Sequence, residues 1–324
     1  MNAIDKYSTL IDRALEDIAI PEKPAGLYDP IRYTMESRGK RLRPVITLMG
    51  CELFDGKINK ALPAAIGMEI FHNFTLIHDD IMDKSPMRRG KPSVYKQWGY
   101  NTALLAGDTM FVHAYEQICK TEPKYLKRVL DIFNFVARKV CEGQQYDMDF
   151  ESIDNVSIAE YIRMIRLKTA ILIAGCLKIG ASIAHAPLQD QDKLFRFGEC
   201  LGIGFQLQDD YLDAFGEEEK VGKQLGNDII TNKKTFLYLK ALEQSKDDKS
   251  RKELKKTYTA NVNPSQKIKT VRDIYKHLKI DEITKEEISN YFHIANHNLQ
   301  EINVPDDRKN ELRNFLKKLE IRNT

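Results

Sequence analysis

Residues 76–83 read Leu-Ile-His-Asp-Asp-Ile-Met-Asp, and residues 205–213 read Phe-Gln-Leu-Gln-Asp-Asp-Tyr-Leu-Asp. Each stretch sets an Asp-Asp-x-x-Asp motif among side chains of the core type. Because an α-helix turns once in 3.6 residues, the first and last Asp of each motif lie one above the other on one face. The two stretches therefore predict two helices that each carry carboxylates along an otherwise apolar surface.

These carboxylates are costly without a counter charge, because acids beside core side chains repel one another and lose hydration. A hard divalent cation satisfies them, and Mg²⁺ typically takes one or two carboxylates plus substrate phosphates. The middle acids, Asp80 and Asp210, lie about 100° around the helix, which favours a role in orienting ligands. One such triplet alone could be a helix cap or a solvated acidic turn. Two of them favour a metal site, and we expect the motifs to face each other across a helical core.

The rest of the chain also shows helical periodicity. Apolar side chains recur every three or four residues within 133–141 and again within 158–165. Two long stretches, 124–186 and 188–263, contain no proline. Alternating Val-Ile-Thr runs with Asn-Gly turns are absent, so no sheet is expected. We predict an all-α fold, a single large helical bundle that forms one domain over residues 1–324.

Local signals mark some helix ends. Ser157 and Glu160 have the spacing of a capping box, and Asp306-Asp307 is expected to open the last helix. Residues 245–270 are rich in Lys, Ser and Asp and predict a solvated helix pair.

Composition narrows the class of protein. The 324 residues carry 50 basic and 47 acidic side chains, a net charge of +3, which gives no reason to expect nucleic acid as a partner. No apolar run reaches the roughly 18 residues that a transmembrane helix needs, and the charged N-terminus is not a signal peptide. No two of the five cysteines are closer than 22 residues, so we expect small core residues in a reducing compartment. These features predict a cytoplasmic enzyme.

Basic residues accompany both aspartate motifs. Gly-Lys-Arg-Leu-Arg-Pro at 39–44 precedes a helix, and Arg-Arg-Gly at 88–90 follows the first motif. Lys-Thr at 168–169 lies in a helical stretch, while Gly222-Lys223 and Asn-Lys-Lys at 232–234 follow the second motif. Arginine forks suit diphosphate oxygens, and lysines act as point charges. Each cluster alone would be surface charge, but together they indicate diphosphate binding.

In this order the motifs resemble those of the trans-isoprenyl diphosphate synthases, the polyprenyl synthetase family, in their short-chain farnesyl and geranylgeranyl type. The resemblance covers residues 39 to about 237 and is specific only when the motifs are taken together. It implies the α-helical prenyltransferase fold, a homodimer and three Mg²⁺ ions. The implied reaction is the head-to-tail condensation of isopentenyl diphosphate with an allylic diphosphate to an all-trans product of fifteen or twenty carbons.

The resemblance also implies a role for each matching residue. The expected Mg²⁺ ligands are Asp79 and Asp83 for two ions and Asp209 for the third. Asp80, Asp210 and Asp213 would orient waters and ligands, and Thr169 and Gln206 would line the reaction centre. The allylic diphosphate is expected to bind Arg88, Lys168, Lys223 and Lys233. Isopentenyl diphosphate is expected to bind Lys40, Arg43, His72 and Arg89, although a buried histidine with purely structural contacts is an alternative for His72.

Product length depends on what lies upstream of the first motif. One helical turn rises 5.4 Å, close to one prenyl unit, so residues there act as depth marks for the growing chain. Phe74, five residues before Asp79, should form the floor of the pocket and limit the product. Thr75 follows it where eukaryotic-type farnesyl synthases often carry a second aromatic residue, and the pattern looks more like archaeal-type geranylgeranyl synthases. Phe74 as an ordinary core residue is the alternative.

Other functions fit the motifs less well. A longer-chain polyprenyl synthase would usually carry a small residue in place of Phe74. A class I terpene cyclase usually replaces the second Asp-rich motif, a non-catalytic synthase subunit loses one or both, and a helical metal hydrolase would not need two diphosphate sites. The preferred primer and the role of the basic tail, Lys317 to Arg322, stay open.

Overall fold

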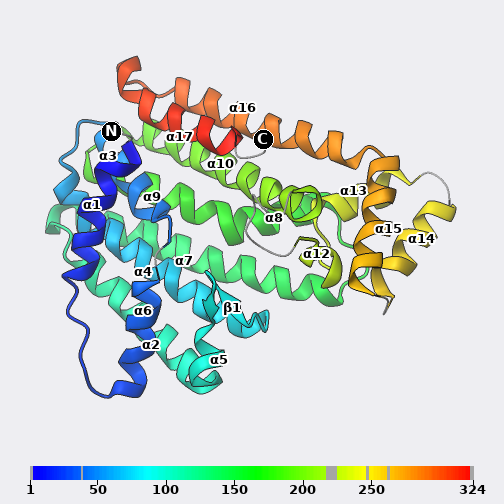
Figure 1. The fold of residues 1–324 in the computed structure, drawn as a ribbon. Helices are drawn as coiled ribbons and strands as arrows, with labels where there is room; N and C mark the ends of the chain where they lie inside the picture. Colours follow the sequence, from blue (N-terminus) through cyan, green and yellow to red (C-terminus); the bar gives the residue numbers. More distant parts are fainter. Residues whose placement is uncertain (1–2, 38, 217–224, 246–247, 261–262, 322–324) are drawn as a thin grey trace. The chain divides into compact units, whose positions relative to one another are not determined.

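The computed structural model describes residues 3–37, 39–216, 225–245, 248–260 and 263–321, and most of them are helical. Figure 1 shows the helices in chain order. The prediction of an all-α fold is confirmed. In sequence order the elements are α1 (Ala3–Glu16), α2 (Ala25–Glu36), α3 (Leu42–Glu52), α4 (Ile58–Met82), β1 (Met87–Arg88), β2 (Lys91–Pro92), α5 (Val94–Trp98), α6 (Tyr100–Cys119), α7 (Pro123–Ser152), α8 (Ile158–Ile165), the π-helix η1 (Arg166–Ala170), α9 (Ile171–Ile183), α10 (Leu188–Phe215), α12 (Asn227–Ile230), α13 (Phe236–Gln244), α14 (Asp248–Thr259), α15 (Pro264–His277), α16 (Ile280–Gln300), the 3₁₀-helix η2 (Asp306–Lys309) and α17 (Asn310–Glu320).

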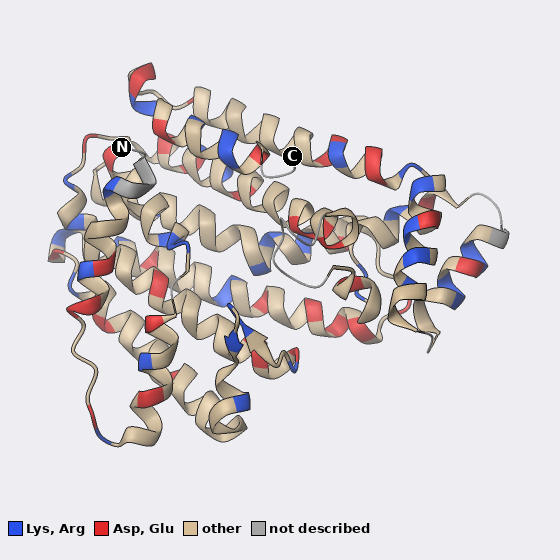
Figure 2. Ribbon diagram, viewed as in Figure 1, with Lys and Arg blue, Asp and Glu red and all other residues tan. Residues whose placement is uncertain are grey.

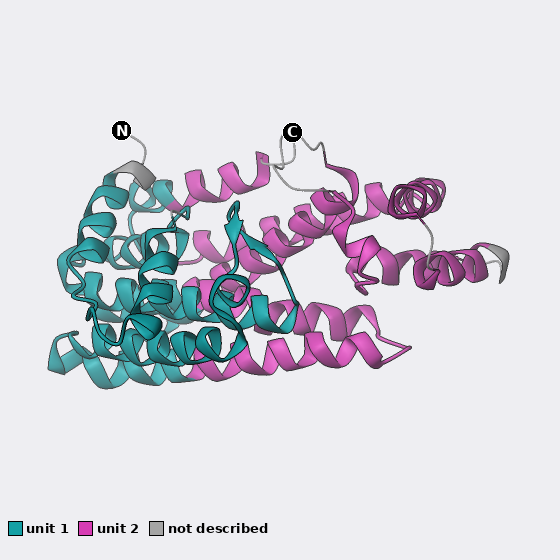
Figure 3. Ribbon diagram, turned by 60° about the horizontal axis from the view of Figure 1, so that its bottom comes forward, with its two compact units in different colours: residues 1–134, 175–192, 303–311 teal, residues 135–174, 193–302, 312–324 magenta. Residues whose placement is uncertain are grey.

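The chain groups into two compact units, coloured separately in Figure 3. Unit 1 comprises residues 1–134, 175–192 and 303–311, and unit 2 comprises residues 135–174, 193–302 and 312–324. Each unit is described by itself. A single domain over residues 1–324 stays a prediction.

Helix α4 forms the centre of unit 1 and packs against α3 and α6. Its buried face is rich in small residues, which lets neighbouring helices approach closely. At Gly67, for example, a Cβ would lie 2.5 Å from Cγ1 of Ile118 and 2.9 Å from the carbonyl oxygen of Ala114, both on α6. Since interiors pack densely, this contact fixes the helix that ends in the first aspartate motif.

A short hairpin follows the first motif, and here the prediction that the chain has no strand is wrong. β1 and β2 pair antiparallel, with Met87 opposite Pro92 and Arg88 opposite Lys91. Arg89 and Gly90 connect them, and both have positive φ, 52° and 75°. Two successive residues of positive φ match the twist of a tight two-residue hairpin. The hairpin therefore depends on turn geometry rather than on a strand-like composition.

Helix α10 organises unit 2, again through close contacts at glycine. A Cβ on Gly202 would lie 2.5 Å from Cα of Ala170 in η1, and one on Gly204 would lie 2.9 Å from the ring of Phe292 in α16. Gln208 donates from Nε2 to the carbonyl oxygen of Leu319, 2.8 Å away. These contacts fix the helix that carries the second aspartate motif.

The predicted helix ends agree with the structure. Ser157 and Glu160 form a complete capping box at the start of α8. Asp306 begins the 3₁₀ turn η2 that leads into α17. Within residues 245–270 the structure has α14 and the first half of α15, and Figure 2 shows Lys and Arg along both helices.

The cysteine prediction is partly wrong. All five are free thiols, but only Cys51 and Cys176 are buried, whereas Cys119 and Cys141 are exposed. Among the described residues, no helix is both long enough and apolar enough to cross a bilayer.

Candidate active site

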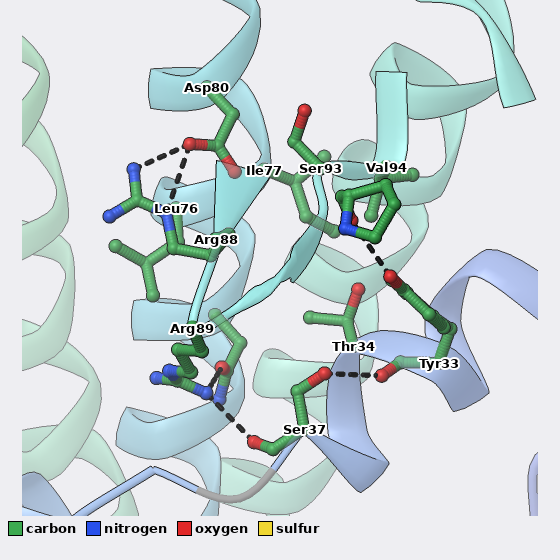
Figure 4. Close-up of a pocket in the computed structure, with 12 residues that line it drawn as sticks. Tyr33, Thr34, Ser37, Leu76, Ile77, Asp80, Arg88, Arg89, Ser93 and Val94 are labelled. Atoms are coloured by element: carbon green, nitrogen blue, oxygen red, sulfur yellow. Dashed lines mark hydrogen bonds and ion pairs between the residues drawn. The ribbon is translucent and has the colours of Figure 1, made fainter. Parts of the chain in front are cut away.

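The first aspartate motif lies at the C-terminal end of α4, in unit 1. Asp80 is buried, and Arg88 of the hairpin donates to its Oδ1 from Nε at 2.9 Å and also from Nη2 (Figure 4). Burial raises the pKa of Asp80, and the Arg88 guanidinium opposes this shift. Nη2 of Arg88 lies 3.9 Å from Oδ2 of Asp79, which is partly exposed, and Asp83 is exposed at the helix end. The motif thus has one buried acid held by Arg88, one partly exposed acid and one exposed acid.

Four arginines gather around His72 on α4, and we call Arg41, Arg43, Arg88 and Arg89 the arginine cluster. His72 is half-buried, and its removal from water together with the four positive charges holds the pKa of its imidazole well below the ordinary value. The imidazole is therefore neutral near pH 7. Lys40 is exposed just before α3, and it is next in sequence to Arg41 of the cluster.

Arg88 and Arg89 are held by their neighbours rather than free to swing. Arg89 donates from Nη1 to the carbonyl oxygen of Ser37 at 2.9 Å and to Oδ1 of Asn73 at 3.3 Å (Figure 4). The cavity that both arginines line has a volume of about 30 Å³, room for about one water molecule. The hairpin therefore presents two fixed guanidinium groups.

The second motif lies in the C-terminal half of α10, in unit 2. Asp210 is buried, and it accepts hydrogen bonds from the hydroxyl of Tyr161 and from Nε2 of Gln206, the latter at 3.0 Å. Oε1 of Gln206 accepts from Oγ1 of Thr169 at 3.1 Å. Burial and the nearby Asp228 carboxylate raise the pKa of Asp210 well above its ordinary value. The structure thus brings together the predicted pair Thr169 and Gln206.

Lys168 lies in the π-helical turn η1, where its Nζ is 2.6 Å from Oδ2 of Asp147 on α7. The turn sits close to α7 because Gly143 has no side chain: a Cβ there would be 2.3 Å from the backbone nitrogen of Lys168. π-helical turns are rare and frequent at functional sites. Sequence reasoning predicted Lys168 but missed Asp147, which carries no local motif signal.

Asp213 accepts from two backbone N–H groups at the start of α12, that of Asn227 at 3.1 Å and that of Asp228 at 2.9 Å. The Asp228 side chain is half-buried near other acids, and this burial with the Asp213 charge raises its pKa to about 7. Sequence reasoning missed Asp228 as a site residue, although it ends the Gly-x-Asp pattern at 226–228.

Lys233 follows on a fixed loop. Its N–H donates to the carbonyl oxygen of Asp228 at 2.8 Å, and the hydroxyl of Tyr258 donates to its own carbonyl oxygen at 2.6 Å. Lys223, the other lysine predicted after this motif, lies outside the described residues.

The donor set suits Mg²⁺. Within the described part of the chain, no three Asp, Glu, His or Cys side chains converge closely enough to hold an ion by themselves. Mg²⁺ typically takes only one or two carboxylates and completes its shell with water and phosphate oxygens. In unit 2, burial and neighbouring carboxylates raise the pKa of Asp210 and of Asp228, so a cation nearby would relieve real repulsion.

Phe74 belongs to an aromatic cluster in unit 1. Its ring centroid lies 5.5 Å from that of Phe71, 5.1 Å from that of Phe111 on α6 and 4.8 Å from that of His78. Thr75 donates from Oγ1 to the carbonyl oxygen of His72 at 2.8 Å. Phe74 thus packs against the rings of Phe71, Phe111 and His78.

Known proteins resemble this chain in sequence and in fold. A family model described as "Polyprenyl synthetase" matches residues 24–278, and the chain belongs to this family of all-helical prenyltransferases. A geranylgeranyl diphosphate synthase from Methanosarcina mazei is 39% identical over 246 residues, 75% of this chain and 76% of that protein. A short chain isoprenyl diphosphate synthase from Methanothermobacter thermautotrophicus is 37% identical over 248 residues, 76% of each.

Solved structures agree along the whole chain. A crystal structure of a geranylgeranyl pyrophosphate synthase has a TM-score of 0.95 and 39% identity, and the match covers 100% of both chains. The geranylgeranyl pyrophosphate synthetase from Pyrococcus horikoshii has a TM-score of 0.91 and 33% identity, covering 98% of this chain and 96% of that chain.

Proposed function

We propose that this prenyltransferase condenses isopentenyl diphosphate with an allylic diphosphate, with Mg²⁺, and that its main product is twenty-carbon geranylgeranyl diphosphate. The observation that carries the proposal is the family match over residues 24–278 together with two intact aspartate motifs on fixed helices. Relatives at 35–40% identity bear geranylgeranyl synthase names, which favours twenty carbons over fifteen.

Isopentenyl diphosphate would bind at the arginine cluster of unit 1. Arg43, Arg89 and His72, with Lys40 at the exposed edge, supply the donors. His72 takes part as a neutral imidazole, because its pKa is held low by burial and the arginines. The guanidinium groups match diphosphate oxygens in pairs, which fixes the direction of the attacking double bond.

The allylic diphosphate would bind through both motifs. Asp79 and Asp83 are the proposed ligands of two Mg²⁺ ions and Asp209 of a third, while Arg88, Lys168, Lys223 and Lys233 complete the positive surroundings. Bound Mg²⁺ would stabilise the charge of the departing diphosphate. Asp80, Asp210 and Asp213 hold other groups in place: Asp80 orients Arg88, Asp210 orients Gln206, and Asp213 anchors the start of α12.

We also propose a homodimer, in the cytoplasm. On α6, Leu104, Leu105 and Val112 are 51%, 56% and 57% exposed and share one face of the helix. Exposed apolar side chains gathered on one helix face commonly mark an interaction surface, and a second copy of the chain is the proposed occupant. Leu104→Glu with Leu105→Glu should give monomers by light scattering, whereas Leu188→Glu, at a position 62% exposed on α10, should leave the mass unchanged.

The reaction is tested by incubating the protein with Mg²⁺, isopentenyl diphosphate and, separately, five-, ten- and fifteen-carbon allylic primers, and then sizing the products. We expect a twenty-carbon product from every primer. Products far longer than this would refute the short-chain proposal. Cyclic hydrocarbons, or free alcohols without chain growth, would refute condensation.

A further inference from the structure

Glu69 is a buried carboxylate in the middle of the arginine cluster. It lies on α4, is 1% exposed, and its Oε1 accepts from Nη1 of Arg41 at 3.0 Å. Arg41 is itself buried and has the left-handed backbone conformation, with φ of 47°. Nη2 of Arg41 donates to the carbonyl oxygen of Met35 at 2.8 Å. The Glu69–Arg41 pair therefore ties the start of α3 to α4 and to the end of α2.

A second contact leads from Glu69 to the hairpin. Asn73, one turn further along α4, donates from Nδ2 to the carbonyl oxygen of Glu69 at 2.8 Å, and the same amide lies 3.4 Å from Oε1. The Asn73 amide therefore turns its Oδ1 toward the hairpin, where Arg89 donates to it at 3.3 Å. Figure 4 shows Arg89 also reaching the carbonyl oxygen of Ser37. Glu69, Asn73 and Arg89 thus form a connected series of polar contacts.

The negative charge of Glu69 offsets the repulsion among the four arginines of the cluster. The arginine cluster brings four positive groups near one another before any substrate binds, and like charges in a poorly hydrated site repel strongly. Of the acids that face this cluster, Asp80 is engaged with Arg88, the partly exposed Asp79 lies 3.9 Å from Nη2 of Arg88, and the exposed Asp12 lies 4.0 Å from Nε of Arg41. The negative charge of the buried Glu69 favours the charged form of Arg89, whereas the positive charges of Arg41, Arg43 and Arg88 disfavour it.

We infer that Glu69, acting through Arg41 and Asn73, is a positioning residue that holds the arginine cluster ready for the diphosphate of isopentenyl diphosphate. This inference rests on the proposed function, which assigns Arg43 and Arg89 to that substrate. It assigns Glu69 no contact with the substrate. The substitution Glu69→Gln is well suited to a test, because it keeps one oxygen for Arg41 and removes only the charge. Oε2 of Glu69 is buried and accepts no hydrogen bond, so an amide nitrogen in its place loses no partner.

The test is steady-state kinetics of the full chain with Mg²⁺, varying each substrate in turn. We expect Glu69→Gln to raise KM for isopentenyl diphosphate about tenfold, because the hydrogen bond from Arg41 becomes one to a neutral acceptor, with KM for the allylic substrate and kcat within about twofold. Asn73→Ala should shift the same KM in the same direction. Asp190→Asn, which also neutralises a buried carboxylate in unit 1, should leave both KM values unchanged.

Two further variants separate the inference from the proposed function. Arg89→Lys should raise KM for isopentenyl diphosphate. The double variant Arg89→Lys/Glu69→Gln should raise this KM by less than the product of the two single effects, because both substitutions act through the Arg89 guanidinium. If Arg89→Lys raises that KM and Glu69→Gln does not, the inference is wrong and the substrate assignment stands. If Arg89→Lys leaves it unchanged while products still form, the substrate assignment is wrong. Equal shifts of both KM values in Glu69→Gln, or a lower melting temperature alone, would reduce Glu69 to a structural residue.

Discussion

Replacing Phe74 by alanine should lengthen the product by one prenyl unit and then stop. The growing chain is proposed to run along α4 toward its N-terminus, so the next aromatic barrier is Phe71, three residues deeper. At 1.5 Å per residue, the floor moves back by about 4.5 Å, close to the length that one prenyl unit adds. Phe71 is fully buried and Phe111 supports it from α6, with ring centroids 5.8 Å apart, so the new floor is firm.

The assay is the product profile of Phe74→Ala with isopentenyl diphosphate and a fifteen-carbon primer, sized by chromatography. We expect twenty-five carbons in place of twenty, and longer chains only when Phe71→Ala is added. Phe74 is partly buried, so the variant should lose about 2–3 kcal/mol of stability, less than a full core truncation, and its melting temperature must be checked. Phe135→Ala, at a position 40% exposed on α7, is the matched control. An unchanged profile in a folded Phe74→Ala variant would remove Phe74 as the floor.

Three other predictions concern single residues. Burial and the arginines lower the pKa of His72, so as the pH falls the imidazole is protonated in the unfolded state before it is protonated in the folded state. The free energy of unfolding should therefore drop by about 1 kcal/mol between pH 7 and pH 5.5. Urea unfolding of His72→Gln should show a pH-dependent drop that is smaller by this amount. Gly143→Ala should push η1 away from α7, which should lower the free energy of unfolding by about 1–3 kcal/mol and slow turnover by displacing Lys168. Gly26→Ala is the control, because a Cβ at Gly26 meets nothing within 4 Å; it should leave the melting temperature unchanged or raise it. Tyr7→Phe should cost about 1–3 kcal/mol in urea unfolding at pH 7, because the buried hydroxyl joins carboxylates of α3 and α17; an unchanged midpoint would show that these contacts contribute nothing.

Much of the fold follows from local patterns that the sequence displays openly. The helices around both motifs, the capping box at Ser157 and the start of α3 after Arg41 all rest on periodicity or on residues close in sequence. The hairpin was missed because Met-Arg and Lys-Pro have no strand-like composition. Its geometry comes from positive φ at two residues, Arg89 and Gly90, and only the second is of a type that announces such a turn.

The sequence predicts the parts of the candidate site that consist of a repeated motif. It does not predict the parts that depend on a single polar residue. Two acidic triplets are a strong signal because they occur twice. Tyr161, Asp147 and Asp228 are solitary polar residues, and only the folded chain brings them to Asp210, Lys168 and Asp213. Glu69 pairs with Arg41, which lies 28 positions away in the sequence. Long-range pairing of this kind leaves no periodic trace in a sequence.

The central claim is that both aspartate motifs serve one Mg²⁺-dependent step. Single-turnover condensation rates of Asp79→Asn, of Asp209→Asn and of the double variant test it most directly, with isopentenyl diphosphate and a fifteen-carbon primer in saturating Mg²⁺. We predict that each single variant loses at least about a thousandfold in rate and that the double variant is at most about tenfold slower than the worse single variant. Losses that multiply fully in the double variant, or an undiminished wild-type rate in chelator without Mg²⁺, would contradict the account.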